Sequence, residues 1–230
     1  MKRFIPHGLL AILVLGSFIT AAPTAKAQGA GLVSSVLSRM EKNRQSLRSL
    51  RAGISMEKYN SQLRDTDRYN GVVLYMPGSG RNASVRIEWK SPQHEIIAVS
   101  NGKYTIFRPR LGTAIVGNST KQPKASGILE MMYMSRQQLE ARFQPLQDVR
   151  EETLWGGVNT IHLTLVPKGN ASYKYAEIWI DSAGMPVQTK IIEKNDDATT
   201  MRLTELERNV KLNSEEFSVK LGADVKIVKG

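Results

Sequence analysis

The strongest constraint on the fold is a period of two in the placement of apolar residues, which is the periodicity of a β-strand. Leu50, Ala52, Ile54 and Met56 alternate with polar or small residues, so a strand here has one apolar face and one polar face. The alternation recurs at 84–90 and 160–165, and runs bounded by turn-forming residues lie at 69–76, 96–99, 104–107, 173–180, 187–193, 199–206 and 225–228. The pattern predicts about ten strands in a mainly β (α+β) fold.

The connections between these runs are short. Asn101-Gly102 separates the runs at 96–99 and 104–107, and this dipeptide is typical of a tight hairpin. Short connections favour an antiparallel meander, because parallel neighbours need long crossovers. A large sheet with one apolar face curls and needs cover on that face.

An amphipathic helix precedes the first strand. Val33, Val36, Leu37 and Met40 follow a helical stripe that resumes at Leu47. Because polar residues lie outside this stripe, the helix has one apolar side. We expect that side to lie against the apolar face of the sheet.

A second helical interval, at 126–134, interrupts the strands. It contains Met131, Met132 and Met134, and Ser135 follows with the spacing to Gln138 of a capping box that begins a further helix. On composition, methionine first suits the ordinary core of a covering helix, and it also suits a surface that re-packs against different apolar ligands. The residues alone leave both interpretations open.

The first 27 residues have the pattern of a secretory leader. Lys2 and Arg3 precede an apolar stretch, and Ala25-Lys26-Ala27 has the small-x-small form of a cleavage site before Gln28. We expect a cleaved signal peptide at 1–27 and a single domain at 28–230, exported to the periplasm. Since the chain has no cysteine, it offers no lipid-attachment site and no disulfide.

The chain is basic, with a formal net charge of +11 that falls to +8 when Lys2, Arg3 and Lys26 leave with the leader. A balance of this kind is common in proteins that bind nucleic acid, an anionic membrane surface or an acidic partner. Export disfavours nucleic acid. An anionic partner and an ordinary solvated face remain.

Catalytic and metal-binding patterns are poorly represented. Without cysteine, a Cys-rich zinc site and a Cys–His nucleophile are impossible. Outside the leader the histidines are His94, at a strand entry, and His162, which the alternation places outward on its strand. We therefore expect no enzyme, no cofactor and no metal, and a hydrolase with an apolar cleft stays an alternative.

Several short segments occur in an order that resembles a known family. They are YMPG at 75–78, RIEWKSP at 86–92, VSNGK at 99–103, FRPR at 107–110 and IWIDSAGMPV at 178–187. In this order they resemble the periplasmic outer-membrane lipoprotein carriers, the LolA family. The resemblance implies an unclosed, strongly curved antiparallel β half-barrel with helices as a lid over an apolar cavity.

The resemblance also implies partners and site residues. The cargo would be an acylated lipoprotein or another lipid, passed by a monomer from an inner-membrane lipoprotein-releasing transporter to an outer-membrane acceptor. Sister families of this fold leave a non-catalytic lipid sensor or envelope-stress adaptor as an alternative. The candidates for the cavity lining are Ile54, Met56, Val85, Ile87, Trp89, Ile97, Val99, Met131, Met132, Met134, Ile161, Leu163 and Leu165. Arg81 and Arg86 flank the place of the family's lid-latching arginine.

Overall fold

One sheet dominates the molecule. The computed structural model describes residues 25–78, 83–118 and 134–230, and the sheet within them has twelve strands. Its strands are β1 (Leu50–Asn60), β2 (Asp65–Met76), β3 (Ser84–Ser91), β4 (Glu95–Ser100), β5 (Lys103–Arg108), β6 (Thr113–Asn118), β7 (Gln147–Leu154), β8 (Val158–Leu165), β9 (Tyr173–Asp181), β10 (Pro186–Glu193), β11 (Ala198–Arg208) and β12 (Lys226–Lys229).

The strand order is β12-β6-β5-β4-β3-β2-β1-β11-β10-β9-β8-β7. It consists of two antiparallel meanders, β1 to β6 and β7 to β11, which join where β1 pairs with β11. The sheet ends at β12 on one side and at β7 on the other, so it is unclosed. The predicted mainly β fold with an unclosed sheet is confirmed.

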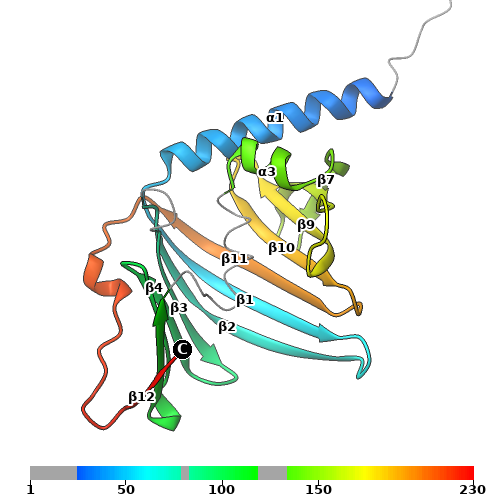
Figure 1. Cartoon of the computed structure of the whole chain (residues 1–230). Helices are drawn as coiled ribbons and strands as arrows, with labels where there is room; N and C mark the ends of the chain where they lie inside the picture. Colours follow the sequence, from blue (N-terminus) through cyan, green and yellow to red (C-terminus); the bar gives the residue numbers. More distant parts are fainter. Residues whose placement is uncertain (1–24, 79–82, 119–133) are drawn as a thin grey trace, which may run out of the picture.

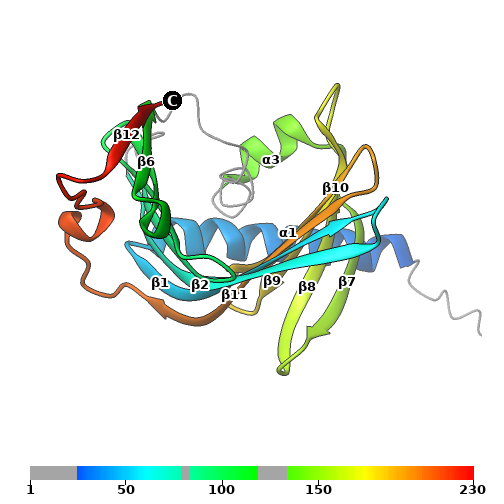
Figure 2. The same cartoon turned by 90° about the horizontal axis from the view of Figure 1, so that it is seen from below.

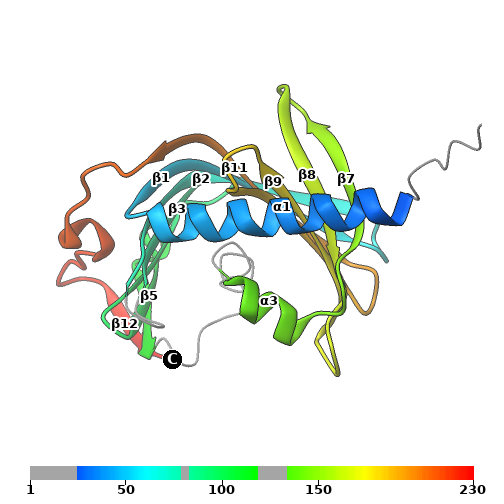
Figure 3. The ribbon, with the colours of Figure 1, turned by 90° about the horizontal axis from the view of Figure 1, so that it is seen from above.

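The sheet curves into a trough, and the helices lie on its hollow side. Figure 2 shows the strands at the β12 end bending upward around a hollow, with α3 (Arg136–Arg142) on the hollow side. Figure 3 shows α1 (Ala25–Ser46) running across the strands above α3. The two helices therefore cover part of the concave face, as the apolar alternation of the strands requires.

The helix boundaries follow from local chemistry. In α3 the Ser135 Oγ accepts from the backbone N–H of Gln138 at 3.2 Å, and the Gln138 side chain accepts from the backbone N–H of Ser135 at 2.8 Å. The predicted capping box is therefore confirmed. In α1 the apolar stripe packs inward, with Val36, Leu37 and Met40 buried.

The segment after β11 crosses the convex face. It contains the short 3-10 helix η3 (Ser214–Phe217), whose Phe217 is buried. This helix lies against β3 and β4, and the Arg86 guanidinium of β3 donates to the Ser218 carbonyl at 2.9 Å. The orange and red segment in Figure 1 thus leads the chain around to β12.

The structure adds two strands to those predicted. These are β6 and β7, which were not among the sequence runs. In the case of β7 the reason is that this edge strand is largely exposed on both faces and shows no apolar alternation. β12 also departs from the expected antiparallel meander, since it pairs with β6 in parallel after a long connection. Residues 1–24 of the expected leader and most of the expected helix at 126–134 lie outside the described residues.

Candidate functional site

The concave face of the sheet, which we call the trough, is apolar from one meander to the other. Residues paired directly across strands share a face. The register therefore places one row of side chains on five adjacent strands, from β1 through β11, β10 and β9 to β8: Met56, Met201, Thr189, Ile178 and Leu163. Four of the five are apolar, and all are buried.

Most of the first apolar cluster lies in the trough on β1, β2, β3 and β11, whereas its Trp179 lies on the convex face of β9, paired with His162. It includes Ile54 and Met56 of β1, each less than a tenth exposed, and Ile87 and Trp89 of β3. The Trp89 ring meets the Tyr69 ring edge to face, with centroids 5.9 Å apart. Two half-buried side chains, Val85 and Ile97, extend this cluster toward the rim of the sheet.

The second apolar cluster lies beneath the helices. Ile161, Leu163 and Leu165 of β8 face the same way as Ile178 and Ile180 of β9. The apolar stripe of α1 and two α3-region side chains, Leu139 and Phe143, pack on them. Ile191 of β10 touches both clusters, so the apolar surface is continuous across the trough.

The predicted lining residues divide between these clusters. Ile54, Met56, Val85, Ile87, Trp89 and Ile97 belong to or pack on the first, and Met134, Ile161, Leu163 and Leu165 belong to the second. Val99 is half-buried and pairs with Val85, which places it on the same face. Met131 and Met132 lie outside the described residues. That these side chains contact cargo stays a prediction.

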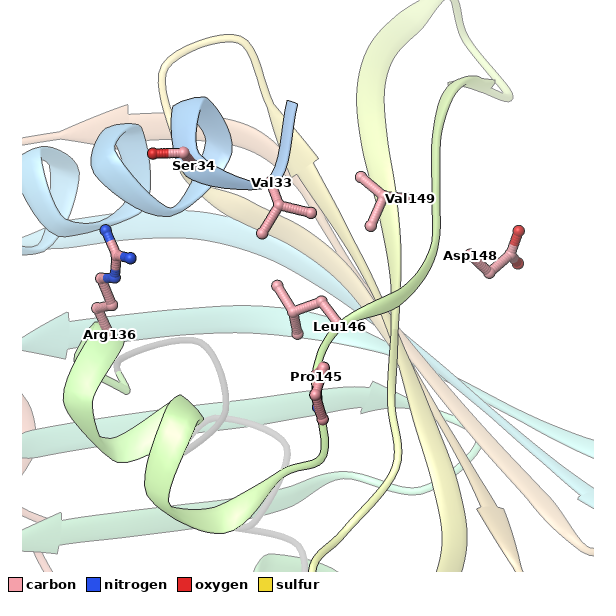
Figure 4. A pocket seen from close by; sticks show the side chains of 7 residues that line it. All are labelled: Val33, Ser34, Arg136, Pro145, Leu146, Asp148 and Val149. Carbon is pink, nitrogen blue, oxygen red and sulfur yellow. The ribbon is translucent and has the colours of Figure 1, made fainter. Parts of the chain in front are cut away.

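A cleft of about 500 Å³ opens at the mouth of the second cluster, between α1 and the connection from α3 to β7. Its size lies within the range of small-molecule sites. Figure 4 shows Val33 of α1, Leu146 and Val149 gathered on one side, with Arg136 and Ser34 together at the other. Val33, Leu146 and Val149 also pack on the second cluster, so the cleft borders that cluster.

The sequence did not identify this cleft. Of the predicted lining residues, none of the eleven that the structure describes borders it; Pro145 and Asp148 complete its wall. The Asp148 carboxylate lies at the rim, where the hydrogen bond from Arg150 lowers its pKa. Val33 belongs to the apolar stripe of the predicted helix, and this position could have indicated that it lines a site. Leu146 and Val149 lie in or beside β7, which has no apolar alternation, so no sequence pattern indicated them.

Glu41 of α1 connects the two helices. Its carboxylate accepts from Arg44 at 2.5 Å and from Gln45 at 2.9 Å, and it lies near enough to the backbone N–H of Arg136, at the first turn of α3, for that group to lower its pKa as well. The Arg44 hydrogen bond is the largest of these influences, and together they lower the pKa of Glu41 to about 2. Glu41 therefore stays ionised and joins the two elements that cover the trough.

The latch candidates from the sequence are placed differently. Arg86 lies on the convex side of β3, where it contacts Ser218 and the Glu88 carboxylate at 3.2 Å. These contacts join it to the C-terminal segment, so its role as a latch stays a prediction with no supporting contact among the described residues. Arg81 lies outside them.

Thr189 is the polar interruption in the apolar row. Its side chain is 1% exposed, and its hydroxyl has no hydrogen-bond partner within the described part of the chain. A buried hydroxyl without a partner is unfavourable. The floor of the trough therefore holds one unpaired polar atom between Met201 and Ile178.

The histidines are not arranged as a catalytic pair. His94 Nε2 lies 3.2 Å from a Glu88 carboxylate oxygen at a strand entry. The prediction that His162 points outward is right about the strand face and wrong about exposure: His162 is 1% exposed. Its face is covered because the Trp179 ring lies against it, with centroids 4.7 Å apart. Across the described ranges no cluster of three metal-ligating side chains occurs.

None of the described helices is both long enough and apolar enough to span a membrane. The family model described as "Outer membrane lipoprotein carrier protein LolA" matches residues 79–220, which is more than half of the chain. Among curated proteins, none matches this sequence.

Solved structures share the fold. An uncharacterized conserved protein from Thermus thermophilus is similar at 14% identity, with a TM-score of 0.55 over 86% of this chain and 99% of that chain. MucB is similar at 14% identity, with a TM-score of 0.52 over 85% of this chain and 64% of that chain. The Pseudomonas aeruginosa MucA/MucB complex is similar at 15% identity, with a TM-score of 0.50 over 85% of this chain and 62% of that chain. The chain thus spans less than two thirds of the MucB chains.

Proposed function

Since the chain belongs to the outer membrane lipoprotein carrier family LolA, we propose that it carries the acyl chains of lipoproteins, or of a related lipid, in the trough. The observation that carries this proposal is the apolar surface that runs unbroken through Ile191 from one cluster to the other. Such a surface suits acyl chains, since each methylene removed from water contributes about 0.8 kcal/mol.

Uptake and release require the cover to move. The described cover consists of α1 and α3, and α3 is only seven residues long. The polar contacts of Glu41 connect these helices at the surface, and surface ion pairs of this kind contribute about 1 kcal/mol or less. The cover is also held by the apolar side chains of α1 and α3 that pack on the second cluster. An entering acyl chain replaces these contacts with others of the same kind, so the exchange needs no energy source, which suits a protein that passes cargo on.

The proposed setting is the periplasm. The leader pattern at 1–27 and the family together support export, with residues 28–230 as the working domain. The proposed donors and acceptors are an inner-membrane lipoprotein-releasing transporter and an outer-membrane acceptor, with the carrier itself a monomer. No catalytic step is part of the proposal, and no cofactor is needed.

A transfer assay tests the proposal. Donor vesicles that hold a fluorescent acylated peptide are mixed with acceptor vesicles, and the rate of transfer is measured with and without the purified domain. We expect acceleration by the wild-type domain. No acceleration, together with no binding of a fluorescent acyl probe in solution, would contradict the proposal.

A matched pair of variants locates the binding face. Val85 of β3 pairs with Tyr75 on the trough face, whereas Val72 of β2 pairs with Glu88 on the convex face, and both valines are half-buried. A glutamate at position 85 must lose its hydration beside an acyl chain, which is costly. We expect Val85→Glu to lose the acyl probe and Val72→Glu to keep it, with thermal unfolding as the check that both fold. The opposite order would place binding outside the trough.

A sensor or adaptor role is the second candidate. It is favoured by the similarity in fold to MucB, whose structure in complex with MucA shows a protein partner. A domain that binds the acyl probe but does not accelerate transfer would support this second role.

A further inference from the structure

An exposed apolar and cationic patch lies at the β12 end of the sheet. We call it the edge patch and define it by Leu111, Ile227 and Val228 with Arg110, Lys226 and Lys229. The turn from β5 to β6 contains the 3-10 helix η1 (Pro109–Leu111), and the backbone N–H of Lys226 donates to the carbonyl of Gly112 at 2.8 Å. This bond fixes β12 beside the turn. Figures 1 and 2 show β12 as the outermost strand, beside β6.

The apolar members of the edge patch are open to solvent. Leu111 is 67% exposed, Ile227 59% and Val228 41%. Single exposed apolar side chains are normal on protein surfaces, whereas a cluster of them indicates an interaction site. β12 pairs with the strand that follows the turn, so its residues lie at the same corner of the sheet as Leu111. Ile227 and Val228 are consecutive on this edge strand and point to opposite faces, so the apolar side chains flank the edge on both sides.

The cations of the edge patch are unneutralised. Arg108, just before the turn, pairs with Glu95 at 2.6 Å. Arg110, Lys226 and Lys229, by contrast, have no ion pair within the described ranges of the chain. Residues 103–118, which cover β5, η1 and β6, contain no acidic residue. The corner therefore presents positive charge beside apolar surface.

Protection of a sheet edge accounts for only part of this pattern. Lysines on an edge strand discourage pairing with other chains, and Lys226 and Lys229 serve that purpose on the edge strand β12. Edge protection does not account for the exposed Leu111 and Ile227, which weaken it. The combination of apolar side chains with cations is instead typical of peripheral binding to anionic membranes, where apolar groups enter the headgroup boundary and cations meet phosphates.

We propose that the edge patch docks the protein on the surface of a bilayer that contains anionic phospholipid. Leu111, Ile227 and Val228 enter the headgroup region, while Arg110, Lys226 and Lys229 contact lipid phosphates. This docking goes beyond the proposed carrier function, because acyl binding in the trough does not require it. It places the carrier at the membrane by its sheet edge.

Vesicle sedimentation tests the docking. The wild-type domain is sedimented with phosphatidylcholine vesicles that either contain or lack phosphatidylglycerol, at low and at physiological salt. We expect binding to the anionic vesicles alone, weakened by salt because the Debye length shortens to about 8 Å at physiological ionic strength. Each cation contributes about fivefold to partitioning. The triple variant Arg110→Gln, Lys226→Gln, Lys229→Gln should therefore bind at least tenfold more weakly.

The β1–β2 hairpin supplies a matched control. Leu63 there is 76% exposed and precedes Arg64, so Leu63→Ser with Arg64→Gln makes the same chemical change as Leu111→Ser with Arg110→Gln. We expect the change at 110 and 111 to reduce vesicle binding and the change at 63 and 64 to leave it intact. Equal effects of the two double variants would overturn the proposal.

Two further outcomes separate this proposal from the carrier function. The edge-patch variants should bind the acyl probe in solution as the wild type does, because the patch lies outside the trough clusters. Absence of wild-type binding to anionic vesicles at low salt would show the docking proposal to be wrong even if acyl binding and transfer persist. In that case, loss of transfer by the edge-patch variants would assign the patch to a protein partner.

Discussion

Replacing Thr189 by valine should stabilise the domain. Valine has the shape of threonine with a methyl group in place of the hydroxyl, and the Thr189 hydroxyl is buried without a partner in the described structure. An unpaired buried hydroxyl costs about 1–3 kcal/mol in proteins. Taking the low end, the free energy of unfolding should rise by about 1 kcal/mol, which raises the Tm by about 2–4 °C for a domain of this size.

Thr160 provides the matched control. It is also buried, at 5% exposure, but its Oγ1 donates to the Glu152 carbonyl at 2.6 Å. Thr160→Val removes that hydrogen bond and should lower the free energy of unfolding by about 1 kcal/mol. Both changes are threonine to valine in a strand, so differences in β-propensity largely cancel. The two variants should therefore differ by about 2 kcal/mol.

The assay is urea unfolding of the wild type and both variants, followed by titration with a fluorescent acyl probe. A more apolar trough floor should keep or improve the affinity of Thr189→Val for the probe. If Thr189→Val is destabilised as much as Thr160→Val, the Thr189 hydroxyl has a partner and the reasoning is refuted. A loss of probe affinity in a stable Thr189→Val protein would show that the hydroxyl binds the ligand.

Three other changes test separate parts of the account. The pKa of Glu41 is lowered to about 2 in the folded protein, so its stabilising effect is complete above its unfolded pKa of about 4.3 and disappears as the pH falls toward 2. In urea unfolding, Glu41→Gln should lower the free energy of unfolding by about 1 kcal/mol at neutral pH and leave it unchanged near pH 2. A loss of stability that does not depend on pH would exclude the ionised carboxylate as its cause. Gly71→Ala would bring a Cβ within 2.2 Å of the Glu88 carbonyl oxygen, so it should destabilise the domain by about 1–3 kcal/mol. An unchanged Tm would show that β2 and β3 are less closely packed. The double variant His94→Gln, His162→Gln should lose stability, since His162 is buried, but keep acyl binding and transfer; loss of transfer by the folded protein would favour the hydrolase alternative.

Local patterns in the sequence predicted much of the fold. Asn101-Gly102 gave the β4–β5 hairpin, and both residues have the positive φ angles, 50° and 73°, that such a turn requires. The alternation of Leu50, Ala52, Ile54 and Met56 gave β1 and the face that it buries. These features depend on short-range chemistry, which the sequence displays directly.

Long-range features were harder to predict. The edge strand β7 has no buried face to impose alternation, so neither that strand nor the cleft beside Val149 was recognisable. The burial of His162 depends on Trp179, which lies on a neighbouring strand. Similarly, the link from Glu41 to Arg136 joins residues far apart in the chain. Such contacts follow from strand order and helix placement, which periodicity does not determine.

Photo-crosslinking with an acyl lipid tests the central claim most directly. A lipid with a diazirine on its acyl chain is bound to the purified domain, irradiated, and the modified residues are mapped by mass spectrometry. We predict labels on the trough face, at half-buried positions such as Val85, Ile97 and Ile191. Labels concentrated instead on the convex face, at Val72 and Leu74 of β2, would contradict the claim that the trough holds the acyl chains.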